Sequence, residues 1–445
     1  MHGYKEEPAL QVLQWILMAL SWVFSAFMMV MMVYQLYLNC FAYRRREKDY
    51  ADHQPAARFL VLVPAHNEEK VIGDIIDNLS RMDYPRELYD FYIIADNCTD
   101  NTAQVAQDAG AQVLVTHKDG PDAPTGKPIA LKKALDMLGD YHKRYDLMMV
   151  FDADNLMDVN MFREINSQYQ DKGRPDFIQC YLGCKNKSGI IAWFYYTSYV
   201  VVNRFTQLAK NRLGLNASIG GTGFAVSTAY LKARGGWSTM SLTEDFEMQV
   251  EATLAGRRIL WNHYTRVYDE KPTSIGASFR QKVRWSQGYT YVALRNTRKV
   301  FASLRQGTLP FREFMSLSTY MYGMFTYIVV LLQSLTSLLL RLPCFTYRFQ
   351  PVTVWTLLPG IVLFIYSYLF LFYWADWLDN GEKLRWRTVP LLLWSLAVNI
   401  GISIASQVMG LLRYRHQGNW VKTEHTLCRK KLDAQDAEDR VASQL

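Results

Sequence analysis

Four long hydrophobic blocks constrain most strongly how this chain can fold. The first, residues 9–43, contains no charged side chain, and three more follow at roughly 317–340, 352–375 and 389–412. Each block is long enough to cross a bilayer as a helix, which takes about 20 apolar residues. Hydrophobic residues make up 50% of the chain, yet the mean hydropathy is only −0.09, so the apolar content is concentrated in these blocks. The sequence therefore predicts a membrane protein with a large polar domain between its first and second blocks.

Basic residues predict the orientation of the chain in the plasma membrane. Arg44, Arg45 and Arg46 follow the first block directly, so the positive-inside rule places residues 44–287 in the cytoplasm. Much of the net charge of +8 lies next to the hydrophobic blocks, which favours contact with the lipid bilayer over binding of nucleic acid. If the three later blocks each cross the membrane, the tail, residues 416–445, lies outside the cell. The basic residues of the tail favour the cytoplasm instead. One C-terminal block is therefore expected to be re-entrant or interfacial.

The pattern around these spans divides the chain into five parts. We expect a transmembrane helix at 1–43, a catalytic domain at 44–287, interfacial helices at 288–316, a transmembrane region at 317–415 and a polar tail. The interfacial assignment depends on residues 288–310, where Val292, Val300 and Phe301 alternate with basic side chains. Six cysteines without CxxC spacing are expected to be free thiols.

Alternating strand and helix patterns make the polar domain an α/β domain. Buried-strand runs at 59–63, 91–95, 112–115 and 147–151 are separated by helical patterns at 68–81, 102–109 and 128–139. This order predicts a mostly parallel sheet with helices on both faces. Ligands of such sheets bind beyond the carboxyl ends of the strands.

Polar residues follow three of the predicted strands. The segments are Pro64–Glu68, Asp96–Asp100 and Asp152–Asp154. Each alone is explained by an ordinary loop, but three on one edge favour a nucleotide crevice. Asp152 and Asp154 offer two hard carboxylates, which suit Mg²⁺ or Mn²⁺ bridging to a diphosphate, although a solvated turn also explains them. Lys127, at the start of a predicted helix, is either a phosphate ligand or a surface lysine.

Two further segments contain candidate catalytic residues. Gly220–Phe224 lets the backbone approach a ligand closely, or forms a simple tight turn. Thr243 is a candidate N-cap for a helix that begins near Glu244 and Asp245. A carboxylate held at such a position can take a proton from an attacking hydroxyl. Acidic residues in a first helical turn are common, so a structural role stays open for both.

Gln281, Arg284 and Trp285 share one face if residues 281–285 are helical. A guanidinium suits phosphate oxygens, and an indole suits the face of a sugar ring. The alternative is a boundary helix with an interfacial tryptophan.

Taken in order, the five segments Pro64–Glu68, Asp96/Asp100, Asp152–Asp154, Thr243–Asp245 and Gln281–Trp285 closely resemble the membrane-bound family 2 glycosyltransferases. That group includes cellulose, chitin, hyaluronan and poly-N-acetylglucosamine synthases. The resemblance implies a GT-A catalytic domain that uses a UDP-sugar and inverts the anomeric centre. The family often has an acidic pair followed by Gly-Ser after its second strand, whereas this chain has Asp96-Asn97-Cys98.

The resemblance also implies roles for individual residues. Asp245 would be the general base, with Thr243 and Glu244 beside it. Asp154, helped by Asp152, would bind the metal, and Asp96 would contact the uridine. Trp285 and the segment Gly221, Thr222 and Gly223 would contact the acceptor. The expected donor-binding residues are Pro64, His66, Glu68, Asp96, Asp100, Lys127, Asp152, Gln281 and Arg284.

These features predict a processive synthase that polymerises a UDP-sugar into a β-linked polysaccharide and exports it. UDP-glucose is slightly preferred over UDP-N-acetylglucosamine, without a residue that explains the preference. The alternatives are a non-processive enzyme that glycosylates a lipid and a non-catalytic nucleotide-binding export subunit. Gln333, Asn399 and Gln407 either line a polymer path or join helices through hydrogen bonds. The segment 419–425 resembles a Trp-containing segment that closes near the catalytic domain, and the last residues are expected to be disordered.

Overall fold

The centre of the polar domain is a mixed eight-stranded sheet with the order β3-β2-β1-β4-β7-β6-β8-β5. The computed structural model describes residues 8–45, 47–120, 123–342, 354–383 and 385–418. Parallel pairing joins β1 to β2 and β4, β2 to β3, and β6 to β8. Antiparallel pairing places β7 between β4 and β6, and β5 beside β8. The strands are β1 (Phe59–Ala65), β2 (Tyr89–Asp96), β3 (Gln112–Thr116), β4 (Leu147–Val150), β5 (Leu156–Met157), β6 (Phe177–Cys184), β7 (Phe224–Ser227) and β8 (Ile259–Asp269).

Helices cover both faces of this sheet, as the sequence predicts. Along β1, Phe59, Val61 and Val63 enter one buried core, whereas Leu60 and Leu62 enter the other. This alternation follows from the two-residue period of a strand. One correction concerns Pro64, which was expected to end the first strand but pairs with Ile94 inside β1. The helices of this half are α2 (Ile72–Ser80), α3 (Thr102–Asp108), α4 (Lys127–Leu138), α5 (Tyr141–Arg144) and α6 (Met161–Asp171).

The second half of the domain contains the longest helix of the domain, α11 (Ile275–Arg305). Gln281–Trp285 lies inside α11. The boundary that we expect between the catalytic domain and the interfacial helices, at residues 287 and 288, therefore lies inside one continuous helix. The other helices are α7 (Gly189–Val202), the π-helix η2 (Asn203–Leu208), α8 (Ala209–Arg212), α9 (Thr228–Ala233) and α10 (Glu244–Leu254).

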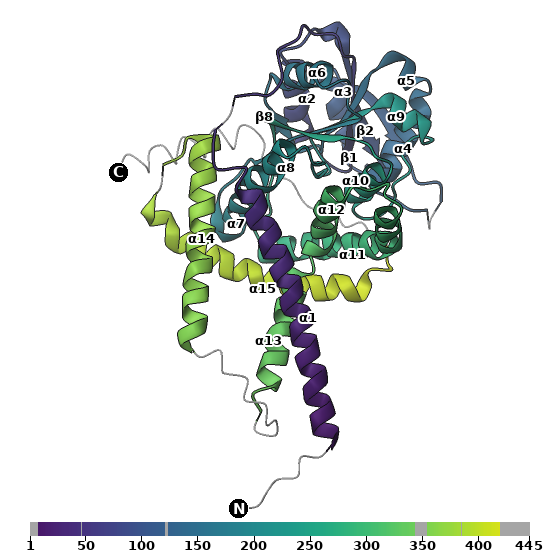
Figure 1. Cartoon of the computed structure of the whole chain (residues 1–445). Helices are drawn as coiled ribbons and strands as arrows, with labels where there is room; N and C mark the ends of the chain where they lie inside the picture. The colour runs from purple at the N-terminus through teal and green to yellow at the C-terminus, as the bar shows by residue number, and fades with distance from the viewer. Residues whose placement is uncertain (1–7, 46, 121–122, 343–353, 384, 419–445) are drawn as a thin grey trace, which may run out of the picture.

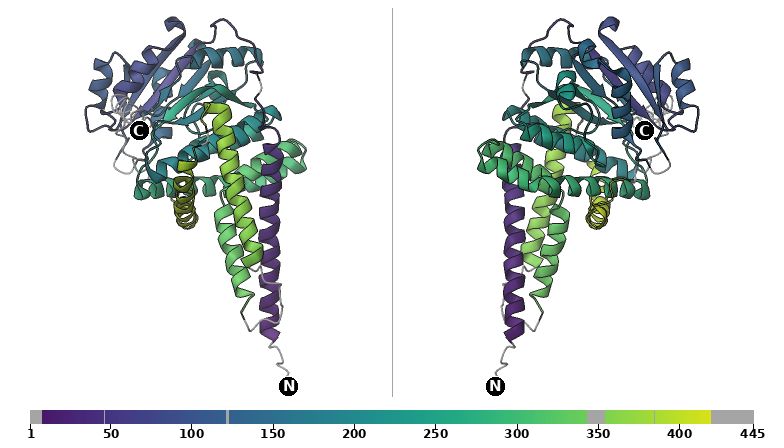
Figure 2. Two further views of the ribbon diagram at one scale, coloured as in Figure 1. Left: turned by 90° about the vertical axis from the view of Figure 1, so that its left-hand side faces the viewer. Right: turned by 90° about the vertical axis from the view of Figure 1, so that its right-hand side faces the viewer.

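Three long helices project from the same side of the domain (Figures 1 and 2): α1 (Pro8–Asn39), α13 (Thr326–Leu339) and α14 (Val354–Asn380). In the described ranges, Pro8–Asn39 and Trp386–Arg413 are long and apolar enough to cross a membrane. The pair α12 (Phe311–Gly323) and α13 would add a third candidate, but it is bent by 68°. The block expected at 317–340 is therefore not one straight helix.

The helix α15 (Val389–Arg413) lies across the direction of α1, against α11 (Figures 1 and 2). Its polar side chains face inward: Asn399 Oδ1 accepts a hydrogen bond from Lys282 Nζ at 3.2 Å. Beyond α15, Gln417 Oε1 accepts the backbone N–H of Leu242 at 3.0 Å. The chain thus returns to the domain after α15. Residues 419–445, with the Trp-containing segment, lie outside the described residues.

The other two polar residues of the hydrophobic blocks also make hydrogen bonds between helices, one through its side chain and one through its backbone. Gln333 Nε2 donates to Ser21 Oγ of α1 at 3.0 Å. The backbone carbonyl of Gln407 accepts from Ser286 Oγ of α11 at 3.5 Å, at the limit of a hydrogen bond. The side-chain contacts of Asn399 and Gln333 match the second interpretation, hydrogen bonds between helices. Gln407 meets α11 through its backbone, and its buried Oε1 has no hydrogen-bond partner among the described residues.

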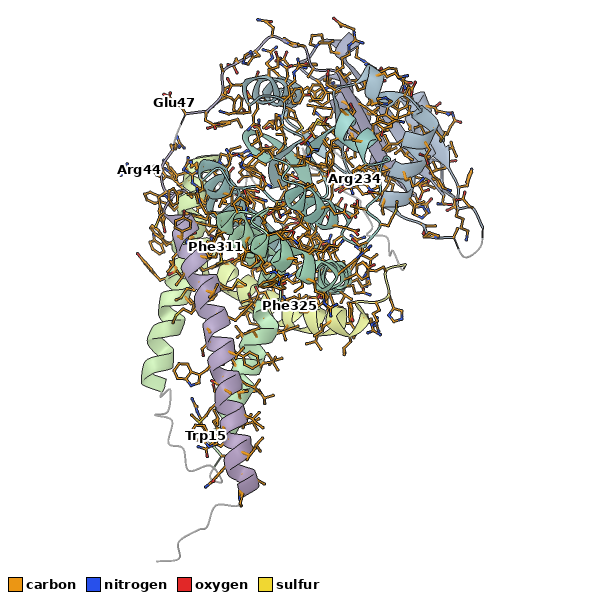
Figure 3. The ribbon with its side chains drawn as sticks, turned by 45° about the vertical axis from the view of Figure 1, so that its right-hand side comes forward. Trp15, Arg44, Glu47, Arg234, Phe311 and Phe325 are labelled. Atoms are coloured by element: carbon orange, nitrogen blue, oxygen red, sulfur yellow. The ribbon has the colours of Figure 1, made fainter. Side chains whose placement is uncertain are left out.

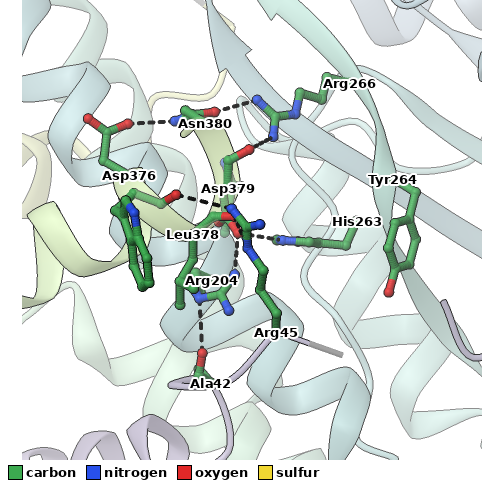
Figure 4. Close-up of polar contacts among 12 residues, drawn as sticks. Ala42, Arg45, Arg204, His263, Tyr264, Arg266, Asp376, Leu378, Asp379 and Asn380 are labelled. Carbon is green, nitrogen blue, oxygen red and sulfur yellow. Dashed lines mark hydrogen bonds and ion pairs between the residues drawn. The ribbon is translucent and has the colours of Figure 1, made fainter. Parts of the chain in front are cut away.

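A buried ionic cluster fixes the end of α14 to the domain (Figure 4). Asp379 forms an ion pair with Arg204 of the π-helix, and its Oδ1 lies 3.0 Å from His263 Nε2. The guanidinium of Arg204 also donates to the carbonyl of Ala42, just after α1, at 2.9 Å. Removing one partner of such a buried pair is strongly destabilising. The cluster therefore holds α1, α14 and β8 in one arrangement.

Candidate active site

The ends of β1 and β2 meet at one edge of the sheet, where their polar residues form a network. The imidazole Nδ1 of His66 lies 2.7 Å from the carbonyl of Asp96. Asp96 is 7% exposed, and its Oδ1 accepts hydrogen bonds from Thr116 at 2.8 Å and from the amide of Asn97 at 2.9 Å. Asn97 has a φ of 51°, a left-handed conformation that asparagine tolerates. The asparagine at the position where the family often has an acid thus suits the turn observed here.

Other predicted donor-binding residues make hydrogen bonds within this edge of the sheet. Asp100 Oδ1 accepts hydrogen bonds from the backbone N–H and the hydroxyl of Thr102, at 3.0 and 2.5 Å. Glu68 is 7% exposed, and its backbone N–H donates to the same hydroxyl at 2.7 Å. Pro64 lies within the paired part of β1. The structure therefore places Pro64, Glu68 and Asp100 in the scaffold of the edge.

Asp152 and Asp154 follow β4 but have different surroundings. The side chain of Asp152 is 42% exposed, and its Oδ1 lies 2.5 Å from Lys127 Nζ. Asp154 is only 3% exposed, and its Oδ2 accepts the backbone N–H of Glu270 at 2.7 Å. No group of three or more His, Cys, Asp or Glu residues that could hold a metal ion occurs in the described part of the chain. Asp152 is thus the more open carboxylate.

Lys127 joins three segments that the sequence singles out. Besides its ion pair with Asp152, Lys127 Nζ donates to the carbonyl of Gly221 at 2.7 Å. Burial alone would lower the pKa of this lysine, but Asp152, Glu244 and Asp245 outweigh that effect and raise it. Lys127 is therefore a cation of the site and not an isolated surface lysine.

The glycine-containing segment before β7 lies against the proposed base. Gly221 has a φ of 77°, and a Cβ built on it would lie 3.1 Å from Asp245 Oδ2. Only a residue without a side chain lets the backbone lie so close there. Thr222 is 4% exposed and hydrogen-bonded to Asn155, and its Oγ1 accepts the backbone N–H of Asp152 at 3.2 Å. Thr222 thus braces Asp152, and Gly221 leaves room for Asp245.

Glu244 and Asp245 begin α10 side by side. Burial and the neighbouring charge of Asp245 raise the pKa of Glu244 to about 7. Burial likewise raises the pKa of Asp245, although the amides at the start of α10 and Lys127 oppose the rise. Thr243 occupies the N-cap position but makes no side-chain capping bond, and it is 3% exposed. Its role is therefore packing, while the two carboxylates carry the charge.

Arg284 of α11 lies close enough to Asp152, Glu244 and Asp245 for the charges of these carboxylates to act on it. Burial lowers the pKa of Arg284, and those three carboxylates oppose the shift. Its guanidinium makes no hydrogen bond or ion pair with any described residue. A guanidinium without a hydrogen-bond partner among the described residues can receive the oxygens of an anionic ligand.

Gln281 and Trp285 are positioned by Tyr195 of α7. Tyr195 donates its hydroxyl to Gln281 Oε1 at 2.9 Å, and its ring meets Trp285 edge to face with centroids 6.2 Å apart. Sequence patterns do not single out Tyr195, because α7 is a nearly uniform run of apolar and aromatic residues. Gly288 was also missed: a Cβ built on it would lie 2.5 Å from Thr243 Oγ1. These contacts set α11 directly against the start of α10.

Comparison with known proteins agrees with this geometry. Residues 55–288 match the family described as Glycosyltransferase like family 2. The chain is 22% identical over 281 residues to a poly-beta-1,6-N-acetyl-D-glucosamine synthase of Staphylococcus epidermidis, covering 63% of this chain and 65% of the relative. It is 26% identical over 238 residues to a beta-monoglucosyldiacylglycerol synthase of Synechocystis, covering 53% and 48%. The match thus spans about half to two thirds of these relatives.

A solved structure has the same fold over most of the chain. The mannosyltransferase PcManGT from Pyrobaculum calidifontis, determined with GDP-Man and Mn²⁺, superposes with a TM-score of 0.60 at 14% sequence identity. The superposition covers 91% of this chain and 100% of the mannosyltransferase. The sheet is therefore a GT-A-like sheet, as predicted. Since the family match covers more than half of the sequence, the chain belongs to glycosyltransferase family 2.

Proposed function

We propose that this protein is an inverting membrane glycosyltransferase that extends a β-linked polysaccharide from a UDP-sugar. The observation that carries the proposal is the position of Arg284, which lies within electrostatic reach of Asp152, Glu244 and Asp245 and makes no hydrogen bond with a described residue. An anion-binding cation and a base of raised pKa, side by side, are what displacement of a diphosphate by a hydroxyl requires.

In the proposed reaction, the oxygen of the acceptor hydroxyl attacks C1 of the donor sugar. The bond between C1 and the diphosphate oxygen breaks, UDP leaves, and Asp245 receives the hydroxyl proton. Gln281, Arg284 and Lys127 orient the diphosphate, and Asp96 binds the uridine. Trp285, steadied by Tyr195, offers a flat surface to the acceptor sugar. Inversion follows, because attack and departure occur on opposite faces of C1.

The residues after β4 fit Mg²⁺ or Mn²⁺ when a diphosphate is present. Mg²⁺ is usually held by one or two carboxylates together with phosphate oxygens. Asp152 offers an open carboxylate, and Asp154 lies two residues away, so a third protein ligand is not required. When bound, the ion would neutralise charge that develops on the leaving diphosphate.

The placement in the membrane is part of the proposal. We place the domain in the cytoplasm of a multi-pass plasma-membrane protein, with α13 leaving it and α14 returning. The basic residues after α1 support this orientation. Under this arrangement α15 lies along the bilayer surface beneath α11, with Trp394 and Leu412 exposed on the lipid side.

Transfer of one sugar to a lipid is the second candidate. The similarity to a beta-monoglucosyldiacylglycerol synthase favours it, whereas the pairing of Trp285 with Gln281 and Arg284 on one helix face favours polymer synthesis. Incubating the reconstituted protein with each radiolabelled UDP-sugar and Mg²⁺ or Mn²⁺ separates the two. A product of high molecular weight supports the polymerase, and a labelled lipid alone would favour the second candidate. We expect UDP-glucose to be used slightly better than UDP-N-acetylglucosamine.

The base is tested by Asp245→Asn. The amide cannot accept the proton, so kcat should fall by about 10²- to 10⁴-fold. UDP should still bind, because Lys127 and Arg284 remain. Glu251→Gln is the control: it lies on α10 but pairs with Arg234, and its turnover should stay near that of the wild type. Unchanged turnover of Asp245→Asn would overturn the mechanism.

A further inference from the structure

An apolar cavity of about 550 Å³ lies outside the active site, between α1, α12 and the loop after α8. Figure 3 shows Phe311, at the start of α12, beside the end of α1 that is nearer the domain. The volume falls within the range of about 300–1,000 Å³ typical of ligand sites. The apolar wall includes Val30, Val33 and Tyr37 of α1, Leu215, and Phe311 and Met315 of α12.

The position of the cavity along α1 indicates what surrounds it. α1 is long and apolar enough to cross a membrane, and the cavity-lining residues lie close to its domain end at Asn39. Val30 and Val33 are 47% and 55% exposed. If α1 spans the bilayer, the cavity therefore opens toward the acyl chains of the leaflet nearest the catalytic domain.

The helix α12 separates the cavity from the active site. Phe314, Leu317 and Met321 pack into one core with Phe246, the residue after Asp245. Phe311 and Met315 line the cavity and share one face of the helix, because they lie four residues apart. Met315 also packs against the edge of that core. A molecule in the cavity would therefore touch α12 on the side away from Asp245.

One cation lies on the wall of this apolar space. Arg312 is exposed, lines the cavity, and donates one hydrogen bond from Nη2 to the carbonyl of Leu213 at 3.0 Å. A guanidinium has five N–H donors, so others remain for a ligand. Arg258 Nη1 donates to the next carbonyl, that of Gly214, at 2.6 Å, which adds positive charge. The adjacent Glu313 accepts the N–H of Asn216 at 3.0 Å.

We propose that this cavity binds an acyl chain of an anionic phospholipid, with the lipid phosphate at Arg312. The apolar wall excludes ordered water and suits hydrocarbon, and guanidinium groups hold phosphate oxygens by charge-assisted hydrogen bonds. The lipid is not the sugar acceptor, because α12 lies between it and Asp245. It fills the space between α1 and α12 and thereby supports the packing of α12 on α10.

The test measures lipid that stays with the purified full-length protein. The protein is reconstituted in bilayer discs of phosphatidylcholine with added phosphatidylglycerol, extracted in mild detergent, and examined by native mass spectrometry. The wild type should retain one phosphatidylglycerol per chain. Arg312→Gln should lower the preference for phosphatidylglycerol over phosphatidylcholine by about fivefold, the value of one arginine near an anionic surface. Val33→Trp should remove the bound lipid by filling the cavity.

Two matched variants control for general effects. Arg305→Gln removes an exposed arginine at the end of α11, and Val23→Trp adds an indole at another exposed position of α1. Both should retain lipid as the wild type does. Retention that is unchanged in Arg312→Gln and Val33→Trp would overturn the proposal, as would a wild type without lipid. A second copy of the chain cross-linked through Val33→Cys in the bilayer discs would overturn it too.

Discussion

The two sides of the active site differ in how their polar groups are satisfied. On the donor side, Asp96 and Asp100 accept hydrogen bonds from Thr116 and Thr102, all within the edge of the sheet. On the base side, Glu244 and Asp245 lie together with raised pKa values, and Arg284 has no partner in the described structure. The donor side is thus held in place by hydrogen bonds of the fold, whereas the base side leaves the guanidinium of Arg284 without a hydrogen-bond partner among the described residues. Changes on the base side should therefore affect catalysis more than stability.

Among changes that leave the base residue itself in place, Gly221→Ala is expected to have the largest effect. The new Cβ would lie 3.1 Å from Asp245 Oδ2, so the base must move. Small misplacements of a catalytic group cost up to about 100-fold in rate, and we expect kcat to fall by about 10- to 100-fold. Steady-state kinetics of sugar transfer measures the change.

Gly214→Ala separates this crowding from backbone strain. Gly214 also has a positive φ, of 70°, but a Cβ built there meets nothing within 4 Å. Both variants should lose a similar amount of stability, about 1–2 kcal/mol for alanine in a left-handed conformation. Only Gly221→Ala should lose activity. Equal activity losses in the two variants would mean that strain, and not contact with Asp245, is responsible.

The second expected effect is a loss of activity at acid pH. Asp245 must be ionised to accept a proton, and the pKa values of both Glu244 and Asp245 are raised, that of Glu244 to about 7. Activity should therefore be constant at alkaline pH and fall about tenfold per pH unit well below the pKa of the pair. In Glu244→Gln the neighbouring charge is gone, so the fall should begin at lower pH.

Stability should depend on pH in the opposite sense. A carboxyl group with a raised pKa binds its proton more tightly in the folded protein than in the unfolded chain. The extra stability is fully present at pH values below the pKa that Glu244 has in the unfolded chain. It is lost as the pH rises toward about 7, the pKa of Glu244 in the folded protein. Unfolding midpoints of the ligand-free protein, compared for wild type and Glu244→Gln between pH 5 and 8, measure this. A variant with the same slope as the wild type would contradict the raised pKa.

The third expected effect is on the contact between α10 and α11. A Cβ on Gly288 would lie 2.5 Å from Thr243 Oγ1 and 2.8 Å from Thr243 N. Gly288→Ala should therefore destabilise the protein by about 1–3 kcal/mol, the usual cost of overpacking. Gly276→Ala, also in α11, meets only Arg280 Nη1 at 3.5 Å and should stabilise the helix by up to about 1 kcal/mol. Thermal unfolding of the two variants shows whether Gly288→Ala lowers the stability of the protein and Gly276→Ala raises it.

The sequence predicted those parts of the molecule that depend on neighbouring residues. Strands β1 to β4 and helices α2 to α4 have clear local periodicities, and the candidate residues at their ends lie on one edge because the strands pair in parallel. Contacts between distant segments were not predictable. Tyr195 and Gln281 meet across the fold, and Gly288 fits against Thr243, only because α7, α10 and α11 pack together.

The same limit explains why the path of α15 could not be predicted. Its hydrophobic length suits a membrane span. What distinguishes it is a stripe of Ser395, Asn399, Ser403 and Ser406, all buried, which a spanning helix could equally direct at a helical neighbour. Only the position of the partner, Lys282 of α11, shows that α15 lies across the base of the domain.

The smallest expected effect is on the donor side, in Thr116→Val. This change removes the hydroxyl that donates to Asp96 Oδ1 at 2.8 Å, and valine suits the strand β3. One buried hydrogen bond is worth about 1 kcal/mol, so UDP should bind about fivefold more weakly, while kcat stays near that of the wild type. Thr308→Val is the control, since Thr308 is exposed and donates only to the carbonyl of Ser303. Calorimetric titration with UDP measures the affinities. A fall in kcat without a change in UDP affinity would show that Asp96 acts on the chemical step, and the division between a donor side and a base side would then be wrong.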